Sequence, residues 1–206
     1  MMKYDIHTHT TCSDGINSVE EVVAHARKIG LAGIAVTDHN TLSGALHAMK
    51  LAGDGLEVIP GYEISAKEGH ILVLGVTELI PKKLSAAEVV EKAHALGGVA
   101  IAAHPFDVIR GGVGKLIFSL DFDGIEVSNG RTLLAWRSAR KAAEKAHLKM
   151  VGGSDAHSLH EMGSVTIDAD GDVLEAIRRG KVVISSNRDR LQIIEDAYRR
   201  IKHLLP

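Results

Sequence analysis

The sequence predicts an α/β fold, a small or incomplete barrel contained in one domain that spans residues 1–206. Short β-rich runs alternate with longer helical patterns along the chain, and this alternation is typical of βαβ units and a parallel sheet. Seven or more such strands fit into the 206 residues, which favours a barrel over an open sheet. Residue types that bind metals recur just after these strands, where α/β barrels carry their active sites.

The first half of the chain contains clear strand and helix signals. Residues 33–37 read Gly-Ile-Ala-Val-Thr, an apolar run that predicts a buried strand. Two helices begin with a capping box, in which Ser18 pairs with Glu21 and Ser85 pairs with Glu88. The predicted strands are residues 3–6, 33–37, 56–59 and 70–76, and the predicted helices are residues 18–29, 42–51 and 85–96.

The second half continues the alternation. Residues 99–103 read Val-Ala-Ile-Ala-Ala, a fully apolar strand, and residues 149–151 form a strand that is followed by two glycines. The last helix carries apolar residues at helical spacing and is expected to close the barrel or to pair with another subunit, so a homo-oligomer is compatible with the sequence. The predicted strands are residues 99–103, 124–127, 149–151, 165–168 and 182–185, and the predicted helices are residues 131–147, 172–179 and 189–204.

The composition is that of a soluble globular protein and argues against several classes of function. The chain is 45% hydrophobic and 24% charged with a formal net charge of -2, so no overall basic field favours nucleic acid. Aromatic residues make up only 3%, which argues against stacking platforms for single strands. The single cysteine, Cys12, and the lack of a signal peptide or a long apolar segment predict a cytoplasmic protein without a membrane partner.

Histidine is frequent, with 12 residues against one cysteine. Histidine is a common metal ligand and also an acid or base near neutral pH. Residues i and i+2 of a strand share a face, so His7 and His9 are expected to point to the same side, and Asp155 and His157 repeat this spacing. The candidate metal ligands all lie near strand ends and are His7, His9, Asp14, His39, Glu63, His70, His104, Asp155 and His157.

Each of these signals has an ordinary alternative explanation. His7 and His9 alone are explained equally well as two unrelated strand histidines, and Glu63 alone as a surface glutamate. Asp38, which follows the strand at residues 33–37, is interpreted as a partner that fixes a histidine tautomer rather than as a ligand. Because buried charges need compensation, the recurrence of such groups after successive strands favours a shared set of cations.

Taken together, these motifs resemble the PHP (polymerase and histidinol phosphatase) family of metal-dependent phosphoesterases. The matching segments run in the family's order and span most of the chain. They are His-Thr-His-Thr-Thr-Cys-Ser-Asp-Gly at 7–15, Thr-Asp-His-Asn at 37–40, Gly-Tyr-Glu at 61–63, Gly-His-Ile-Leu at 69–72, His-Pro at 104–105 and Gly-Ser-Asp-Ala-His at 153–157. The resemblance implies a distorted, TIM-like (β/α)7 barrel.

The resemblance also implies a site for three divalent metal ions. The implied ligands are His7, His9, Glu63 and Asp155 for the first ion, Glu63, His70 and His104 for the second, and Asp14, His39 and His157 for the third. Nitrogen and oxygen ligands without sulfur suit Mn²⁺, Zn²⁺ or Fe²⁺. Such ions supply hydroxide near neutral pH for in-line attack on a phosphate ester. The residues expected to carry the reaction are His7, His9, Glu63, Asp155 and His157.

The substrate is left open between several classes. Arg110, Arg131 and Lys67 are candidates for a phosphate clamp, and solvated surface charge explains them equally well. The slightly acidic charge favours a small phosphomonoester or a nucleotide over nucleic-acid ends, which an exonuclease or phosphodiesterase would cleave. A catalytically inactive binding subunit predicts missing ligands, and a barrel-type amidohydrolase does not explain Asp14 together with the Asp155–His157 pair, so both are less favoured.

Overall fold

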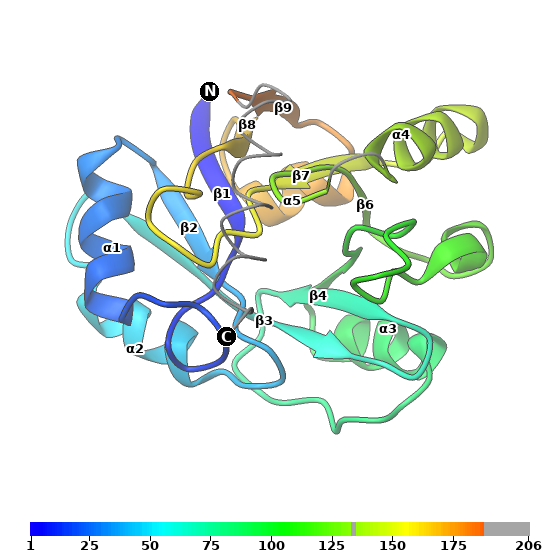
Figure 1. Cartoon of the computed structure of the whole chain (residues 1–206), viewed down its shortest axis with the longest axis horizontal. Helices are drawn as coiled ribbons and strands as arrows, with labels where there is room; N and C mark the ends of the chain where they lie inside the picture. The colour runs from blue at the N-terminus through cyan, green and yellow to red at the C-terminus, as the bar shows by residue number, and fades with distance from the viewer. Residues whose placement is uncertain (133–134, 188–206) are drawn as a thin grey trace, which may run out of the picture.

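The computed structural model describes residues 1–132 and 135–187, whose strands form one sheet in the order β7-β6-β5-β4-β3-β2-β1-β8-β9. The strands are β1 (Met2–Thr8), β2 (Gly33–Val36), β3 (Glu57–Ser65), β4 (His70–Leu74), β5 (Val99–Ala102), β6 (Gly124–Asn129), β7 (Met150–Gly153), β8 (Val165–Ala169) and β9 (Val183–Ser186). The α-helices are α1 (Val19–Lys28), α2 (Ser43–Leu51), α3 (Ala86–Ala95), α4 (Ala135–Ala146) and α5 (Val173–Arg178), and Gly114–Phe118 form a short 3₁₀ helix. The sheet curls into a nearly closed barrel with α1 to α4 on its outside, which confirms the predicted fold class (Figure 1).

The sheet is mixed, so the expectation of a parallel sheet is wrong. Strands β1, β2 and β3 run parallel, as do β5, β6 and β7, but β4 is antiparallel to both of its neighbours. Only residues 66–69 join β3 to β4, which is too short for a crossover helix, so the chain turns directly back. Strand β4 therefore begins at the end of the barrel where its neighbours finish.

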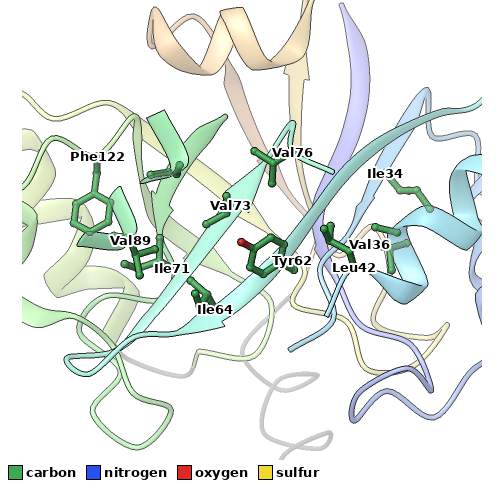
Figure 2. Packing of buried hydrophobic residues seen from close by; sticks show 14 of the residues in the cluster. Ile34, Val36, Leu42, Tyr62, Ile64, Ile71, Val73, Val76, Val89 and Phe122 are labelled. Atoms are coloured by element: carbon green, nitrogen blue, oxygen red, sulfur yellow. The ribbon is translucent and has the colours of Figure 1, made fainter. Parts of the chain in front are cut away.

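Alternating side chains give the sheet an outer and an inner apolar layer. In β4, Val73 belongs to the outer layer and its neighbour Leu72 to the inner one. The outer layer extends from the strands to α2 and α3, with Tyr62 of β3 near its centre, as Figure 2 shows. In the inner layer, Ile177 of α5 packs against the strands. Full burial of each such large apolar side chain stabilises the fold by about 1.5–3 kcal/mol.

The barrel closes between β1 and β7 by a short seam rather than by a continuous ladder. Thr8 at the end of β1 forms an isolated parallel bridge with Ala156, which follows β7. The buried carboxylate of Asp5 accepts hydrogen bonds from the backbone N–H groups of Ser154 (3.1 Å) and Gly163 (2.8 Å). These contacts bring the segment after β1 beside the segment after β7.

Most predicted elements agree with the structure. Both capping boxes are present, and Ser18 accepts from the backbone N–H of Glu21 while the Glu21 carboxylate accepts from the N–H of Ser18. Strand β3 is longer than predicted, because it continues to Ser65 instead of stopping at residue 59. The predicted helix at residues 189–204 lies outside the described residues. Among the described helices, none has the length and apolar character needed to cross a membrane.

Candidate metal centre

All nine predicted ligands gather at one end of the barrel. His70 reaches this end because it is the first residue of the antiparallel strand β4 and pairs with Ser65, the last residue of β3. Neighbouring imidazole rings are close together, with centroids 4.3 Å apart for His9 and His157 and 5.5 Å apart for His70 and His104. The cluster draws on residues in or directly after β1, β2, β3, β4, β5 and β7.

Glu63 lies at the centre of the cluster. It is within β3 rather than after it, between Tyr62 and Ile64, which pack in the outer apolar layer, so its side chain points into the barrel. Its side chain is 1% exposed, and its two oxygens lie beside five imidazoles. The contacts are Oε1 to His70 Nδ1 (3.1 Å) and His104 Nε2 (3.2 Å), and Oε2 to His7 Nε2 (3.4 Å), His9 Nε2 (3.4 Å) and His39 Nδ1 (3.3 Å).

Two aspartates flank this centre on the side of the seam. Asp155 Oδ1 is 3.6 Å from His7 Nε2 and 3.5 Å from His9 Nε2. Asp14 Oδ2 is 3.0 Å from His157 Nε2 and 3.6 Å from His39 Nε2. Three groups have ligand atoms within 4.8 Å of one another, namely His9, Asp14, His39 and His157; His7, His9 and Glu63; and His39, Glu63 and His70.

Several imidazole nitrogens in the cluster lack hydrogen-bond partners among the described residues. They are Nδ1 and Nε2 of His9 and Nδ1 of His39, His70 and His104. A buried polar atom without a partner costs about 1–3 kcal/mol, and native structures rarely tolerate several together. Imidazole nitrogens that face carboxylate oxygens offer lone pairs to a shared cation. The donor set therefore fits divalent metal ions.

The electrostatics of the cluster favour positive charge. Burial opposes protonation of His7, but the negative charges of Asp155, Glu126 and Glu63 outweigh it and raise the pKa of His7 well above its usual value. Burial acts in the same direction on His9, and interaction with Asp155 and Glu63 raises its pKa to about 9. The cationic imidazoles in turn hold the pKa of Glu63 well below its usual range despite its burial. The carboxylates that favour a proton here would equally favour a metal ion.

The cluster forms one wall of an open cavity with a volume of about 340 Å³. Arg131 reaches this cavity, and its Nη1 lies 2.7 Å from His157 Nδ1. The buried Nε of Arg131 has no hydrogen-bond partner within the described part of the chain. Lys67 is exposed and is not among the residues that line the cavity, so its role in a clamp stays a prediction.

Arg110 also lines the cavity, but its guanidinium is already engaged. Nε donates to Asp107 (3.0 Å), Nη1 donates to Asp155, and Nη2 donates to Asn129 Oδ1 (3.0 Å). Asn129 Nδ2 donates to the same Asp155 Oδ2 (3.0 Å). One oxygen of Asp155 is thereby fixed by Arg110 and Asn129, while the other faces the imidazoles of His7 and His9.

Sequence reasoning assigned no role to Glu126 and misjudged Asp38. Glu126 is 2% exposed and contacts His7. Its place in Ile125-Glu126-Val127 repeats the apolar-carboxylate-apolar pattern that surrounds Glu63. That repeated pattern was the available signal. The carboxylate of Asp38 accepts from Thr10 and Ser13, not from a histidine, so its predicted role in fixing a tautomer is wrong.

Comparisons with known proteins agree with this geometry. The family model described as PHP domain matches residues 5–204. The uncharacterized protein MJ1587 of Methanocaldococcus jannaschii is 41% identical over 140 residues, which cover 62% of this chain and 82% of that protein. A phosphoribosyl 1,2-cyclic phosphate 1,2-diphosphodiesterase of Eggerthella lenta is 38% identical, over 37% of this chain and 32% of that enzyme. A 5'-3' exoribonuclease of Haemophilus influenzae is 41% identical, over 39% of this chain and 31% of that enzyme.

The matched segment thus spans about a third of the length of these two named enzymes. Solved structures resemble the fold as a whole. A two-domain protein from Bacteroides vulgatus, which contains a predicted PHP-like metal-dependent phosphoesterase, has a TM-score of 0.73 and 21% identity over 95% of this chain and 69% of that one. PsfC from Pseudomonas syringae has a TM-score of 0.72 and 17% identity over 99% of both chains.

Proposed function

Because the chain belongs to the PHP domain family, we propose that it hydrolyses phosphate esters with divalent metal ions held by its histidine and carboxylate cluster. The observation that carries this proposal is the Glu63 carboxylate, which is buried among five imidazoles. Four of these, His9, His39, His70 and His104, have a buried nitrogen without a hydrogen-bond partner among the described residues. Bound ions activate water and offset the charge of phosphoryl oxygens.

We extend the proposal to three ions per chain, chosen from Mn²⁺, Zn²⁺ and Fe²⁺. Glu63 presents one oxygen to His70 and His104 and the other to His7 and His9, so it can serve ions on both sides. Asp14 with His39 and His157 supplies a third group of ligand atoms. The donors are nitrogen and oxygen only, which suits these borderline ions.

The chain's own cations would bind the phosphoryl group beside the ions. Arg131 lines the cavity, and its Nε has no hydrogen-bond partner among the residues that the structure describes, so it is the better candidate for direct phosphate contact. Arg110 is engaged by Asp107, Asp155 and Asn129, so its contribution is to hold Asp155 and the cavity wall. A cavity of about 340 Å³ accommodates a small phosphomonoester or a nucleotide.

A second candidate is cleavage of a phosphodiester at the end of a nucleic acid. The observation that favours it is the similarity to a 5'-3' exoribonuclease and to a cyclic-phosphate diphosphodiesterase, at 41% and 38% identity over the matched segments. The formal net charge of -2 argues against broad binding of a polyanion, which leaves the terminal nucleotides as the recognised part.

The test is reconstitution of the metal-stripped protein. Mn²⁺, Zn²⁺, Fe²⁺ or Mg²⁺ is added back, and hydrolysis of p-nitrophenyl phosphate, bis-p-nitrophenyl phosphate, nucleoside monophosphates and a 5'-phosphorylated oligonucleotide is measured. Activity that returns with metal supports the phosphoesterase, and the preferred substrate decides between monoester and diester. Failure to hydrolyse any of these with any ion, together with less than one bound ion per chain, would overturn the proposal.

Replacing Arg131 by Ala is expected to raise KM for a phosphomonoester about 10- to 100-fold, since hydrogen bonds to charged groups contribute about 1.5–3 kcal/mol. Arg131→Lys should recover part of the lost affinity, because lysine restores the positive charge but lacks the planar guanidinium that binds phosphate with two hydrogen bonds. Arg137→Ala is the matched control, as Arg137 is exposed and does not line the cavity. Equal KM values for the Arg131 and Arg137 variants would contradict a phosphate contact.

A further inference from the structure

Glu126 connects two of the clustered histidines from a position where it makes no contact with the cavity itself. It lies in β6 and is 2% exposed. Its Oε1 is 3.0 Å from His7 Nδ1. Its Oε2 accepts from the backbone N–H of His104 at 2.7 Å and from Asn129 Nδ2 at 2.9 Å. Both oxygens of the Glu126 carboxylate thus contact residues that build the site.

The contact with His7 decides which ring nitrogen carries a proton. An ionised carboxylate only accepts hydrogen bonds, so Nδ1 of His7 must be the donor. In the neutral ring Nε2 then carries a lone pair and no proton. Nε2 faces Glu63 Oε2 at 3.4 Å and Asp155 Oδ1 at 3.6 Å. Three lone pairs that face one another are favourable only with a proton or a metal ion among them.

The contact with His104 fixes a strained backbone. His104 has a φ of 29°, in the left-handed region that a residue with a side chain rarely adopts. Glu126 Oε2 accepts a hydrogen bond from the backbone N–H of His104 at 2.7 Å, and this bond compensates for part of that strain. His7 and His104 lie on opposite oxygens of Glu63, so one buried side chain orients a histidine on each side of the centre.

We propose that Glu126 is a positioning residue that fixes the His7 tautomer and the His104 backbone, so that His7 Nε2 and His104 Nε2 are both presented to the metal ions. This inference rests on the proposed function for the identity of the ligand. It assigns a role to a residue that is not itself one of the nine candidate ligands.

Glu126→Gln tests the tautomer with almost no change of shape. If the amide oxygen keeps the His104 N–H, the amide NH2 donates to His7 Nδ1, and the ring proton moves to Nε2, where it blocks the metal-facing atom. If the amide flips, its NH2 group faces the backbone N–H of His104 and the Nδ2 of Asn129. Donors then face donors, which is unfavourable. Asn129 cannot turn to relieve this, because its Oδ1 already accepts from the Arg131 backbone N–H at 2.9 Å.

The experiment compares wild type, Glu126→Gln and Asp38→Asn by zinc affinity and by ¹⁵N NMR of the ring nitrogens, with His7→Gln to assign the His7 signals. Asp38 is the matched control, a buried carboxylate whose partners include the Thr10 and Ser13 hydroxyls, which can accept as well as donate. We expect a bonded Nδ1–H on His7 in wild type and Asp38→Asn, its loss in Glu126→Gln, and zinc affinity about 10- to 100-fold lower in that variant alone.

Two results separate this inference from the function on which it rests. If wild type binds zinc and Glu126→Gln binds it equally while keeping the Nδ1–H of His7, the positioning role is overturned and the phosphoesterase proposal stands. If wild type binds no divalent metal, the proposed function fails. The NMR signals of the metal-free protein, recorded at alkaline pH where the His7 ring is neutral, then still decide whether Glu126 sets the His7 tautomer.

Discussion

Glu63→Gln is expected to lower kcat/KM for phosphate esters by on the order of 10³-fold or more, with loss of bound metal. The amide keeps one oxygen and replaces the other with an NH2 group, which cannot bind a cation. One orientation of the amide removes the acceptor from His70 and His104, and the other removes it from His7, His9 and His39. Either orientation therefore disrupts half of the cluster.

The measurement pairs steady-state kinetics with metal content by mass spectrometry. Glu57→Gln is a matched control, since Glu57 begins the same strand, is exposed, and accepts only from Tyr4 OH (3.0 Å) among the side chains described around it. Far-UV circular dichroism checks that both variants fold. A Glu63→Gln protein that retains its metal and more than about a tenth of wild-type activity would refute the central role of this carboxylate.

Removal of metal is expected to lower Tm by about 8–16 °C. An ion that binds only the native state at a concentration of about 1,000 times its Kd stabilises it by about 4 kcal/mol. For a domain of 150–250 residues, each kcal/mol shifts Tm by about 2–4 °C. The imidazole nitrogens that have no hydrogen-bond partner in the described part of the chain add to the expectation, because they gain a partner when an ion binds.

Thermal scans in chelator and in graded Mn²⁺ or Zn²⁺ provide the measurement. The Glu57→Gln protein should shift as wild type does, and Glu63→Gln should respond much less to the same ions. A wild-type Tm that is the same in chelator and in millimolar metal would show that the cluster is stable without ions. That outcome would count against a metal centre even if some hydrolysis were detected.

The sequence predicted the local structure better than the long-range pairing. The capping boxes at Ser18 and Ser85 involve groups three residues apart, and both are present. The antiparallel direction of β4 could not be read from periodicity, because a strand's own pattern does not identify its neighbours. For that reason the pattern alone could not place His70, the first residue of a strand, beside ligands that follow other strands. The turn at residues 66–69 brings it to the site.

For the site too, local patterns in the sequence were informative and long-range contacts were not. Residue types and spacing indicated the nine candidate ligands, and the fold brings them together. No role could be assigned to Glu126 from the sequence, because a single carboxylate in an apolar strand does not reveal that it contacts His7, 119 residues away. Arg110 lines the cavity, but its bonds to Asp107, Asp155 and Asn129 depend on tertiary contacts that spacing does not encode.

The seam between β1 and β7 has a consequence for how the protein is made. Asp5 and Ser154 are 149 residues apart, so closing that loop costs about 4 kcal/mol in chain entropy. On a ribosome that adds about 5–20 residues per second, Asp155 and His157 are synthesised roughly 7–30 s after His7 and His9. The nascent chain thus carries seven of the nine candidate ligands before the last two are made. Assembly of the centre is therefore a late event, after the first six strands have emerged, and any truncation before β7 yields a chain that cannot complete it.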